Sequence, residues 1–275
     1  MEPILIVGVI GPTASGKSGK AVEIALERNG EVISVDSRQV YRTLDIGTEK
    51  IGEKEMRGVP HHLIDVRDPR EVYSAGDFVV DATRLIADIH ARGKPPILAG
   101  GTHFYFDALL NGLPKEAPAN PSLREALEQR SAEDLYTELL GKDPDRAAVL
   151  DPQNKRRLVR ALELVEAFGT VPEREAPKQE YDVTWVVINP PKEVLRERID
   201  ARLTETFARG LVDEVRRVRD AVGDARLNEL GLEYRVVGEY LRGERDEESL
   251  HPALSAKLWQ YARHQKAWLR KLQDY

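Results

Sequence analysis

The spacing of apolar residues makes the first third of the chain look different from its middle. Short apolar runs there alternate with stretches of helical periodicity, which predicts parallel strands that are joined by helices. The predicted strands are Ile4–Ile10, Glu31–Val35, His62–Val66 and Pro96–Ala99, and the predicted helices are Lys17–Arg28, Ala75–Arg92 and His103–Leu110. The first third is therefore expected to be an α/β domain with a parallel sheet.

The middle of the chain has a different pattern. From Pro114 to about Phe168 no strand pattern is found, and apolar residues recur at helical spacing. A β run returns at Thr184–Ile188, and helical patterns then continue to Leu272. We expect one α/β core with C-terminal helices, formed by residues 1–114 and 176–275, and a helical insertion domain at residues 115–175.

Composition excludes several classes of protein. The chain has 275 residues, of which 41% are hydrophobic, as in packed globular proteins. It has no cysteine, which excludes disulfides, thiolate catalysis and cysteine zinc sites, so an intracellular, cytoplasmic enzyme is the simplest expectation. The apolar run Ile4–Ile10 is much shorter than the roughly 20 residues that span a bilayer, so we expect no membrane association.

The net charge of −6 means that contact with a nucleic acid would depend on local basic clusters. Such clusters occur at Lys155-Arg156-Arg157 with Arg160, at Arg196, Arg198 and Arg202, at Arg216, Arg217 and Arg219, and at Arg263, Lys266, Arg270 and Lys271. For any one cluster, a solvated helix face balanced by nearby acidic residues explains the charges at least as well as a nucleic-acid site.

The clearest chemical signal is a phosphate-binding loop between the first predicted strand and helix. It matches the pattern G-x-x-x-x-G-K-[ST] and consists of Gly11, Pro12, Thr13, Ala14, Ser15, Gly16, Lys17 and Ser18. Backbone N–H groups of such a loop converge on phosphate oxygens at a helix N-terminus. Lys17 would reach a phosphate, and the Ser18 hydroxyl would coordinate Mg²⁺. The fold class is therefore α/β with a P-loop NTPase-like parallel sheet flanked by helices.

Two further polar residues follow predicted strands, at the sheet edge where α/β proteins bind ligands. Asp36 comes directly after Glu31–Val35, and its carboxylate suits a general base, a Mg²⁺ ligand or a helix N-cap. Thr102 follows the Gly100-Gly101 pair, and on local grounds an N-cap is its more common role. The residues themselves leave these alternatives open.

The motifs, taken in order, resemble the tRNA dimethylallyltransferases, the tRNA isopentenyltransferase or IPP transferase family, in its bacterial form. The resemblance covers nearly the whole chain. It is carried by GPTASGKS at 11–18, DSRQVYRTLDIGTEK at 36–50, PHHLIDVRDP at 60–69, YSAGDF at 73–78, GGTHFY at 100–105, DPQNKRRLVRALE at 151–163 and RHQKAWLRK at 263–271. The chain departs from the family pattern at Arg38, where a small residue is common, and around Gly231–Arg235.

The resemblance implies a reaction and roles for particular residues. The P-loop would hold the pyrophosphate of dimethylallyl diphosphate with Mg²⁺, and Arg202 would lie near that diphosphate. Asp36 would be the base that accepts a proton from the adenine N6, Thr102 would hydrogen-bond near the reaction centre, and Lys17 would stabilise the leaving diphosphate.

The resemblance also implies a macromolecular substrate, the tRNA anticodon stem-loop, with the prenyl group going to the adenosine on the 3′ side of the anticodon. Residues matching the family's tRNA contacts are Asp36, Ser37, Arg38, Gln39, Thr102, Gln153, Asn154, Lys155, Arg156 and Arg157. The target base would leave its stack and enter a pocket. We expect the protein to act as a monomer.

Three rival functions remain consistent with parts of the sequence. A small-molecule kinase would use the P-loop for ATP and Asp36 to activate a hydroxyl. A free-nucleotide isopentenyltransferase would prenylate AMP, ADP or ATP without tRNA. A non-catalytic RNA-binding module would carry a vestigial P-loop, which the intact Lys17, Ser18, Asp36 and Thr102 disfavour.

Overall fold

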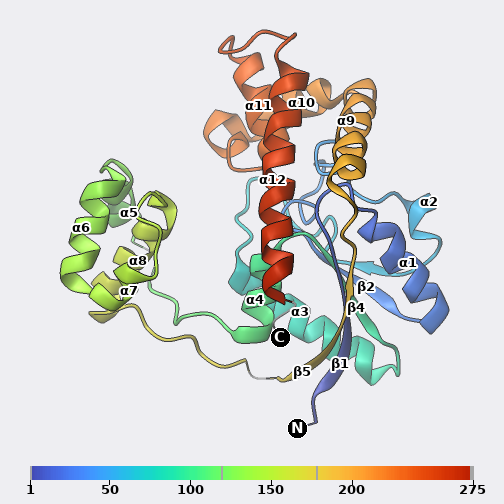
Figure 1. Cartoon of the computed structure of the whole chain (residues 1–275), viewed down its shortest axis with the longest axis horizontal. Helices are drawn as coiled ribbons and strands as arrows, with labels where there is room; N and C mark the ends of the chain where they lie inside the picture. Colours follow the sequence, from blue (N-terminus) through green and yellow to red (C-terminus); the bar gives the residue numbers. More distant parts are fainter. Residues whose placement is uncertain (1, 119, 178, 273–275) are drawn as a thin grey trace. The chain divides into compact units, whose positions relative to one another are not determined.

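The fold is given by a computed structural model that describes residues 2–118, 120–177 and 179–272 (Figure 1). The chain forms two compact units. The core unit consists of Met1–Leu110 and Gln179–Tyr275, and the insertion unit consists of Asn111–Lys178. The helical region predicted at 115–175 falls within the insertion unit.

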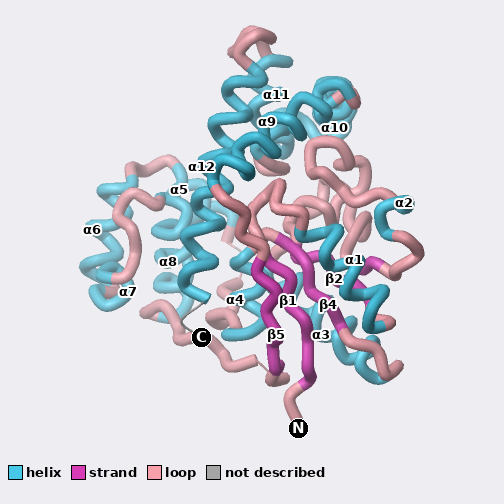
Figure 2. Tube along the Cα trace, turned by 45° about the vertical axis from the view of Figure 1, so that its right-hand side comes forward, coloured by secondary structure: helices cyan, strands magenta, loops and turns pink. Residues whose placement is uncertain are grey.

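The core unit is built on a sheet of five parallel strands in the order β3-β2-β4-β1-β5. Figure 2 labels β2, β4, β1 and β5 of this sheet. The strands are β1 (Ile4–Ile10), β2 (Glu31–Val35), β3 (His61–His62), β4 (Pro96–Gly100) and β5 (Tyr181–Val187). A parallel sheet and the first, second and fourth predicted strands are therefore confirmed, and the β run after the insertion joins the sheet next to β1.

The strand register brings the carboxyl ends of four strands into one row. Ile10 pairs with both Gly100 and Val187, and Val35 pairs with Gly100. A Cβ on Gly100 would lie 2.0 Å from the carbonyl oxygen of Val35, so the close approach of β2 and β4 requires glycine there. The segments that follow these strands all begin at the same edge of the sheet.

Successive side chains of β1 point to opposite faces of the sheet and so enter two different cores. Val7 and Val9 pack with helix α1 (Lys17–Arg28) on one face of the sheet. Ile6 and Ile10 face a larger core that also contains apolar residues of α3 (Ala75–Ala91) and α4 (His103–Asn111). A short helix, α2 (Glu53–Met56), lies between β2 and β3 in the chain.

Four helices follow β5 and extend the larger core. They are α9 (Lys192–Ala208), α10 (Leu211–Leu227), α11 (Leu232–Leu241) and α12 (Leu250–Leu272). In Figure 1, α12 runs from the group formed by α9, α10 and α11 towards α4. The backbone of α10 is interrupted at Gly223, where φ is 77°. None of the helices in the described ranges combines the length and apolar character of a bilayer-spanning segment.

The insertion unit is helical, as the sequence predicts. Its helices are α5 (Pro121–Glu128), α6 (Ala132–Lys142), α7 (Pro144–Ala148) and α8 (Lys155–Phe168). Asn120, Ser131, Asp143 and Asn154 each accept a hydrogen bond from a first-turn amide, so all four helices begin at a capping side chain. Leu135, Leu139 and Leu158 are fully buried in the unit's own core.

The predicted strand His62–Val66 is mostly wrong, because β3 ends at His62. The apolar alternation of this segment suits a strand, but Leu63 and Asp65 adopt positive φ angles of 61° and 57°. These left-handed residues turn the chain, and the Asp65 amide donates to the carbonyl of Gln39 instead of a strand ladder (3.1 Å). A two-residue strand remains at the edge of the sheet.

A buried carboxylate fixes the long loop after β2 to the C-terminal helices. Glu214 on α10 is 2% exposed and accepts hydrogen bonds from the consecutive amides of Asp45, Ile46 and Gly47 at 3.0, 2.7 and 2.9 Å. The hydroxyl of buried Tyr234 donates to the same carboxylate at 2.7 Å. Four donors thus satisfy one buried negative charge, as burial of a charge requires.

We predict that Glu214→Gln lowers the free energy of unfolding by about 2–3 kcal/mol, because an amide keeps one acceptor oxygen and turns an NH₂ group towards amide donors. Urea denaturation followed by circular dichroism measures the change.

Tyr234→Phe is the matched control, because it removes one of the four donors and leaves the carboxylate bound by three amides. Its expected cost is about 1 kcal/mol. If Glu214→Gln unfolded at the same urea concentration as the wild type, the carboxylate would not hold the loop.

Candidate active site

The P-loop joins the end of β1 to the start of α1 in a conformation that exposes backbone donors. Ala14 and Gly16 have φ angles of 60° and 92°, and the Ser15 amide donates to the Pro12 carbonyl at 3.2 Å. Gly16 is the N-cap of α1 and supplies no side-chain hydrogen bond to the first turn. The free N–H groups at this helix end form a site for an anion.

Two cationic side chains, Lys17 and Arg202, lie at this loop. The Lys17 ammonium donates to the Pro12 carbonyl (3.4 Å), and the Arg202 guanidinium donates to the Thr13 hydroxyl (2.7 Å). Burial lowers the pKa of Lys17 to about 8; the charge of Asp36 raises it and that of Arg202 lowers it further. The charges of a carboxylate and of a second cation therefore both act on Lys17, and an anion bound beside it would favour its charged form.

Arg198 is a further cation at the loop that the sequence left outside the predicted site. It lies one turn before Arg202 on α9, and its guanidinium donates to the carbonyl of Ser15 at 3.2 Å. The spacing of four residues puts both arginines on one face of the helix. That spacing within the basic cluster at 196–202 was the signal that could have identified Arg198.

The two serine hydroxyls of the loop have different surroundings. Among the described residues, the Ser15 hydroxyl is buried without a hydrogen-bond partner, and a Cβ on Gly11 would lie 2.6 Å from it. Ser18 is exposed, and its hydroxyl has no protein partner within the described residues. No cluster of three or more His, Asp or Glu side chains suited to a metal occurs among the residues that the structure describes.

Asp36 shapes the turn that follows β2 with one oxygen of its carboxylate. Its Oδ1 accepts hydrogen bonds from the amides of Arg38 (2.8 Å) and Gln39 (3.3 Å). Residues 37–40 form turns and not a helix, so this is a turn cap and not the helix N-cap considered from the sequence. The second oxygen, Oδ2, has no hydrogen-bond partner in the described part of the chain.

The side chain of Gln39 extends this turn to the loop held by Glu214. Its Nε2 donates to the carbonyls of Thr48 and Glu49 at 3.3 and 3.2 Å. The turn at Asp36 is therefore connected through Gln39 to a loop that is itself fixed by the buried carboxylate on α10.

Thr102 joins the turn after β4 to the turn after β2. Its hydroxyl accepts a hydrogen bond from the Ser37 amide at 3.1 Å, and its own amide donates to the Val35 carbonyl at 3.2 Å. Thr102 immediately precedes α4, as the N-cap interpretation requires, but its hydroxyl binds a neighbouring segment. This bond brings Thr102 and the Asp36 turn together.

Gln265 on α12 joins the P-loop to the turn after β4, and sequence reasoning did not place it in the site. Its Oε1 accepts from the Thr13 amide (2.8 Å), and its Nε2 donates to the Gly101 carbonyl (3.0 Å). The residue is 3% exposed, so both halves of the buried amide are satisfied by backbone groups. A glutamine within a basic helical motif gives no local sign of this role.

Glu233 adds a second carboxyl group near Asp36. Burial raises the pKa of Glu233 to about 7, the charges of Glu49 and Asp36 raise it further, and that of Arg202 lowers it. Sequence reasoning noted Gly231–Arg235 only as a departure from the family pattern and did not place Glu233 in the site.

The predicted RNA-contacting residues of the insertion unit lie around the start of α8. The Asn154 side chain caps the helix by accepting from the Arg157 amide at 3.3 Å. Gln153, Arg156 and Arg157 are exposed, and Lys155, Arg156 and Arg157 form no ion pair within the described ranges. Arg160 differs, because it pairs with Glu163 at 3.2 Å. Three unpaired cations thus follow one another at a helix start.

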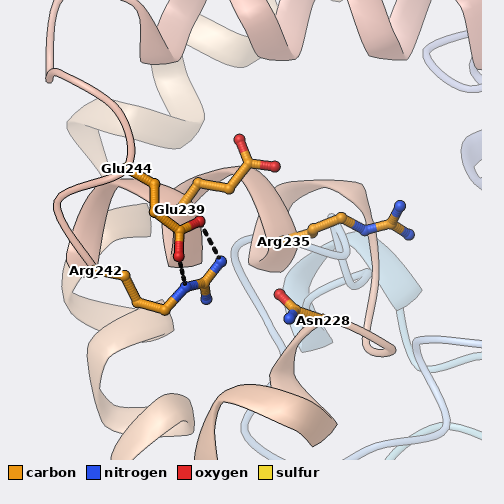
Figure 3. Close-up of a pocket in the computed structure, with 5 residues that line it drawn as sticks. All are labelled: Asn228, Arg235, Glu239, Arg242 and Glu244. Atoms are coloured by element: carbon orange, nitrogen blue, oxygen red, sulfur yellow. Dashed lines mark hydrogen bonds and ion pairs between the residues drawn. The ribbon is translucent and has the colours of Figure 1, made fainter.

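A separate surface hollow of about 460 Å³ is lined by Asn228, Arg235, Glu239, Arg242 and Glu244. Figure 3 shows the Arg242 guanidinium joined to the Glu244 carboxylate, with Arg235 directed away from that pair. The two hydrogen bonds measure 2.6 and 3.0 Å. No segment that follows a strand lines this hollow, so it is not part of the candidate active site.

We predict that Glu233 makes stability fall as pH rises. Its pKa is near 7 in the folded protein and 4.5 in the unfolded chain, so its contribution is complete below pH 4.5 and is lost as pH rises through 7. The free energy of unfolding of Glu233→Gln, relative to that of the wild type, should therefore be higher at pH 8 than at pH 5 by about 1–2 kcal/mol. This figure allows for the partial exposure of Glu233. Urea denaturation at both pH values measures this.

Glu205→Gln is the control for loss of one negative charge, because Glu205 is an exposed residue on the neighbouring helix α9. Identical pH dependence in Glu233→Gln and the wild type would mean that Glu233 is ionised throughout this range.

Comparison with known proteins agrees with this geometry. The family model for IPP transferase matches residues 39–272. A tRNA dimethylallyltransferase from Thermomicrobium roseum is 44% identical over 98% of this chain and 84% of the relative, and one from Anaeromyxobacter dehalogenans is 40% identical over 97% and 92%.

Solved structures show the same similarity. A full-length tRNA isopentenylpyrophosphate transferase from Bacillus halodurans is 37% identical, with a TM-score of 0.73 over 98% of this chain and 87% of its own. A eukaryotic dimethylallyltransferase acting on tRNA is 29% identical, with a TM-score of 0.81 over 97% and 70%. The P-loop, the parallel sheet and the match over nearly the whole length lead to one conclusion: this chain belongs to the IPP transferase family, that of the tRNA dimethylallyltransferases.

Proposed function

We propose that this protein transfers a dimethylallyl group from dimethylallyl diphosphate to N6 of the adenosine 3′-adjacent to the anticodon of tRNA, and releases diphosphate. The observation that carries the proposal is the aligned sheet edge. There, the P-loop with Lys17 and Arg202 lies beside the turn of Asp36, as transfer from a diphosphate to an amine requires. We further propose that the protein acts in the cytoplasm as a monomer.

The P-loop side of the site would stabilise the diphosphate leaving group. As N6 attacks C1 of the donor, the bond from C1 to oxygen breaks and negative charge grows on the diphosphate. Backbone N–H groups at the start of α1 and the cations Lys17, Arg198 and Arg202, which hydrogen-bond the P-loop, would supply donors and positive charge to this region. Such fixed donors and charges act on the transition state without reorganisation.

The residues present fit a Mg²⁺ ion that arrives with the substrate. Mg²⁺ commonly takes one or two protein oxygens and completes its shell with phosphate oxygens and water. Ser18 has an exposed, unpartnered hydroxyl at the start of α1, which suits that role. The ion would neutralise charge on the departing diphosphate.

Asp36 would accept the proton that N6 loses when the new carbon–nitrogen bond forms. Its Oδ1 is occupied by two turn amides, which fixes the carboxylate and leaves Oδ2 for the substrate. Thr102 would act near the same centre, since its hydroxyl holds the Ser37 amide and thereby the turn. General-base catalysis of this kind contributes about 10²–10⁴-fold in rate.

The insertion unit would bind the RNA backbone. Lys155, Arg156 and Arg157 lack ion-pair partners among the described residues, so their charges are available to phosphates. Gln153 and Asn154 lie at the same helix start, and Ser37, Arg38 and Gln39 of the core unit would contact the RNA at the target adenosine.

The proposed activity is tested by incubating the protein with Mg²⁺ and radiolabelled dimethylallyl diphosphate, with unmodified tRNA, AMP and ATP in separate reactions. We expect label only in tRNA, and Asp36→Asn should reduce kcat by about 10²-fold or more with tRNA affinity changed by no more than a few fold. Asparagine keeps the oxygen that holds the turn, so its effect isolates the lost base.

Label in AMP or ATP would instead identify an enzyme that prenylates free nucleotides. Absence of label in every reaction would contradict prenyl transfer and favour a kinase. A wild-type rate in Asp36→Asn would remove Asp36 as the base.

We predict that replacing Arg156 and Arg157 together by alanine weakens tRNA binding and lowers its salt dependence. For each phosphate contact that is lost, binding releases one counterion fewer. The magnitude of the slope of log K against log salt should therefore fall by about 1–2. Filter binding of tRNA at KCl concentrations from about 50 to about 300 mM would give the slope.

The charge-matched control replaces Arg124 and Arg160, which both pair with Glu163 in the same unit. Its slope should stay close to that of the wild type. Equal slopes for both double variants would show that Arg156 and Arg157 do not contact phosphates.

A further inference from the structure

One face of α12 covers the ends of the central strands. Tyr261, Gln265 and Trp268 are four and three residues apart, so they lie on the same side of the helix. Gln265 binds the P-loop and the turn after β4, and the Trp268 ring stacks on His103 with centroids 4.2 Å apart and an interplanar angle of 3°. These contacts place this face of α12 against the candidate active site.

Tyr261 lies on this face one turn from Gln265, which binds the Gly101 carbonyl. Gly101 is next to Thr102, the residue that holds the turn of Asp36. Burial raises the pKa of the Tyr261 phenol, and the charges of Asp36 and Glu233 raise it further. Yet 41% of Tyr261 is exposed. The ring is therefore accessible to a ligand, one turn of α12 from the Gln265 side chain that contacts the P-loop and the turn after β4.

The other tyrosines near the site cannot serve a ligand in this way. Tyr41, Tyr73 and Tyr105 are 2%, 6% and 4% exposed and belong to the core. Phe104 on α4 is 55% exposed, but no described contact connects it with the turn of Asp36. Tyr261 thus combines an accessible aromatic ring with proximity to the proposed base.

This combination fits the chemistry of an adenine that must be reached outside its stack. Transfer to N6 requires the base to leave the anticodon loop, which costs its stacking energy. Proteins recover such energy by stacking the base on an aromatic side chain, worth about 1–3 kcal/mol per base. We propose that the Tyr261 ring is the surface on which the target adenine stacks while its N6 faces Asp36; this inference rests on the proposed function.

The hydrogen bonds of Gln265 explain why the ring would be ready before the RNA binds. Gln265 is one turn from Tyr261 and is held at both ends of its amide by backbone groups. The helix cannot turn about its axis without breaking these buried bonds. The ring is therefore held at a fixed place relative to the P-loop, where the donor would be bound.

The test uses the full chain and an anticodon stem-loop RNA with 2-aminopurine at the target position. 2-Aminopurine has no N6 group, so it reports binding without reaction, and its fluorescence falls when it stacks on a ring. We expect the bound probe to be at least about twofold brighter in Tyr261→Leu than in the wild type, and Tyr261→Phe to restore the quenched signal. Phe104→Leu, which removes an exposed ring elsewhere, should keep the wild-type signal.

Steady-state kinetics with the unmodified stem-loop give a second readout. Tyr261→Leu should lower kcat/KM for RNA by about 10-fold to 100-fold, as loss of one stacked base implies, with the KM for dimethylallyl diphosphate unchanged. A loss of folded protein would lower kcat for both substrates and leave both KM values alone. Tyr261→Phe should recover most of the loss.

Equal probe fluorescence in Tyr261→Leu and the wild type would overturn the inference, as would a Tyr261→Phe defect equal to that of Tyr261→Leu, which would assign the role to the hydroxyl. Failure of the proposed function is a separate result. It would show as absence of prenyl transfer by the wild type, whereas failure of this inference leaves the wild type active.

Discussion

The arrangement of the site depends on one buried amide, the side chain of Gln265. Parallel strands bring the P-loop and the turn after β4 to the same edge, but backbone pairing ends at Ile10 and Gly100. Beyond those residues, the amide of Thr13 and the carbonyl of Gly101 would each lack a protein partner. Gln265 satisfies both, and a buried donor or acceptor without a partner costs about 1–3 kcal/mol. The amide thus fixes α12 and both loops at once.

Charge at this edge is balanced between two sets of side chains. Lys17, Arg198 and Arg202 lie at the P-loop; the charge of Asp36 raises the pKa of Lys17, and that of Arg202 lowers the pKa of Glu233 on α11. Neither set is neutralised by a tight ion pair among the described residues. An arrangement of this kind attracts an anion to the loop and leaves a carboxylate nearby to accept a proton, the two demands of the proposed reaction.

Much of the sheet could be predicted, and several residues of the candidate site could be proposed, because their signals are local. β1, β2 and β4 are short apolar runs, and Asp36 and Thr102 follow such runs directly. His62–Val66 had the same apolar pattern, but the left-handed residues Leu63 and Asp65 end the strand, and periodicity carries no information about φ.

The residues that were missed act through tertiary contacts. Gln265 resembles an ordinary polar residue of a basic helix, and Tyr261 resembles one of several tyrosines. Their positions at the site exist only because α12 returns across the strand ends, where Gln265 binds Thr13 from 252 residues earlier in the chain. Arg198 is an intermediate case. Its spacing from Arg202 could be read from the sequence, but its hydrogen bond to the Ser15 carbonyl could not.

The sequence left structural and chemical roles for Asp36 and Thr102 as alternatives, and the geometry shows why the two need not compete. A carboxylate has two oxygens, and at Asp36 the turn uses only Oδ1. At Thr102 the hydroxyl accepts from Ser37, which leaves its proton free to donate. Each side chain is therefore held by one polar atom or lone pair and has another available. A base that is fixed by its own turn loses little entropy on reacting, so the turn is part of what makes Asp36 suited to catalysis.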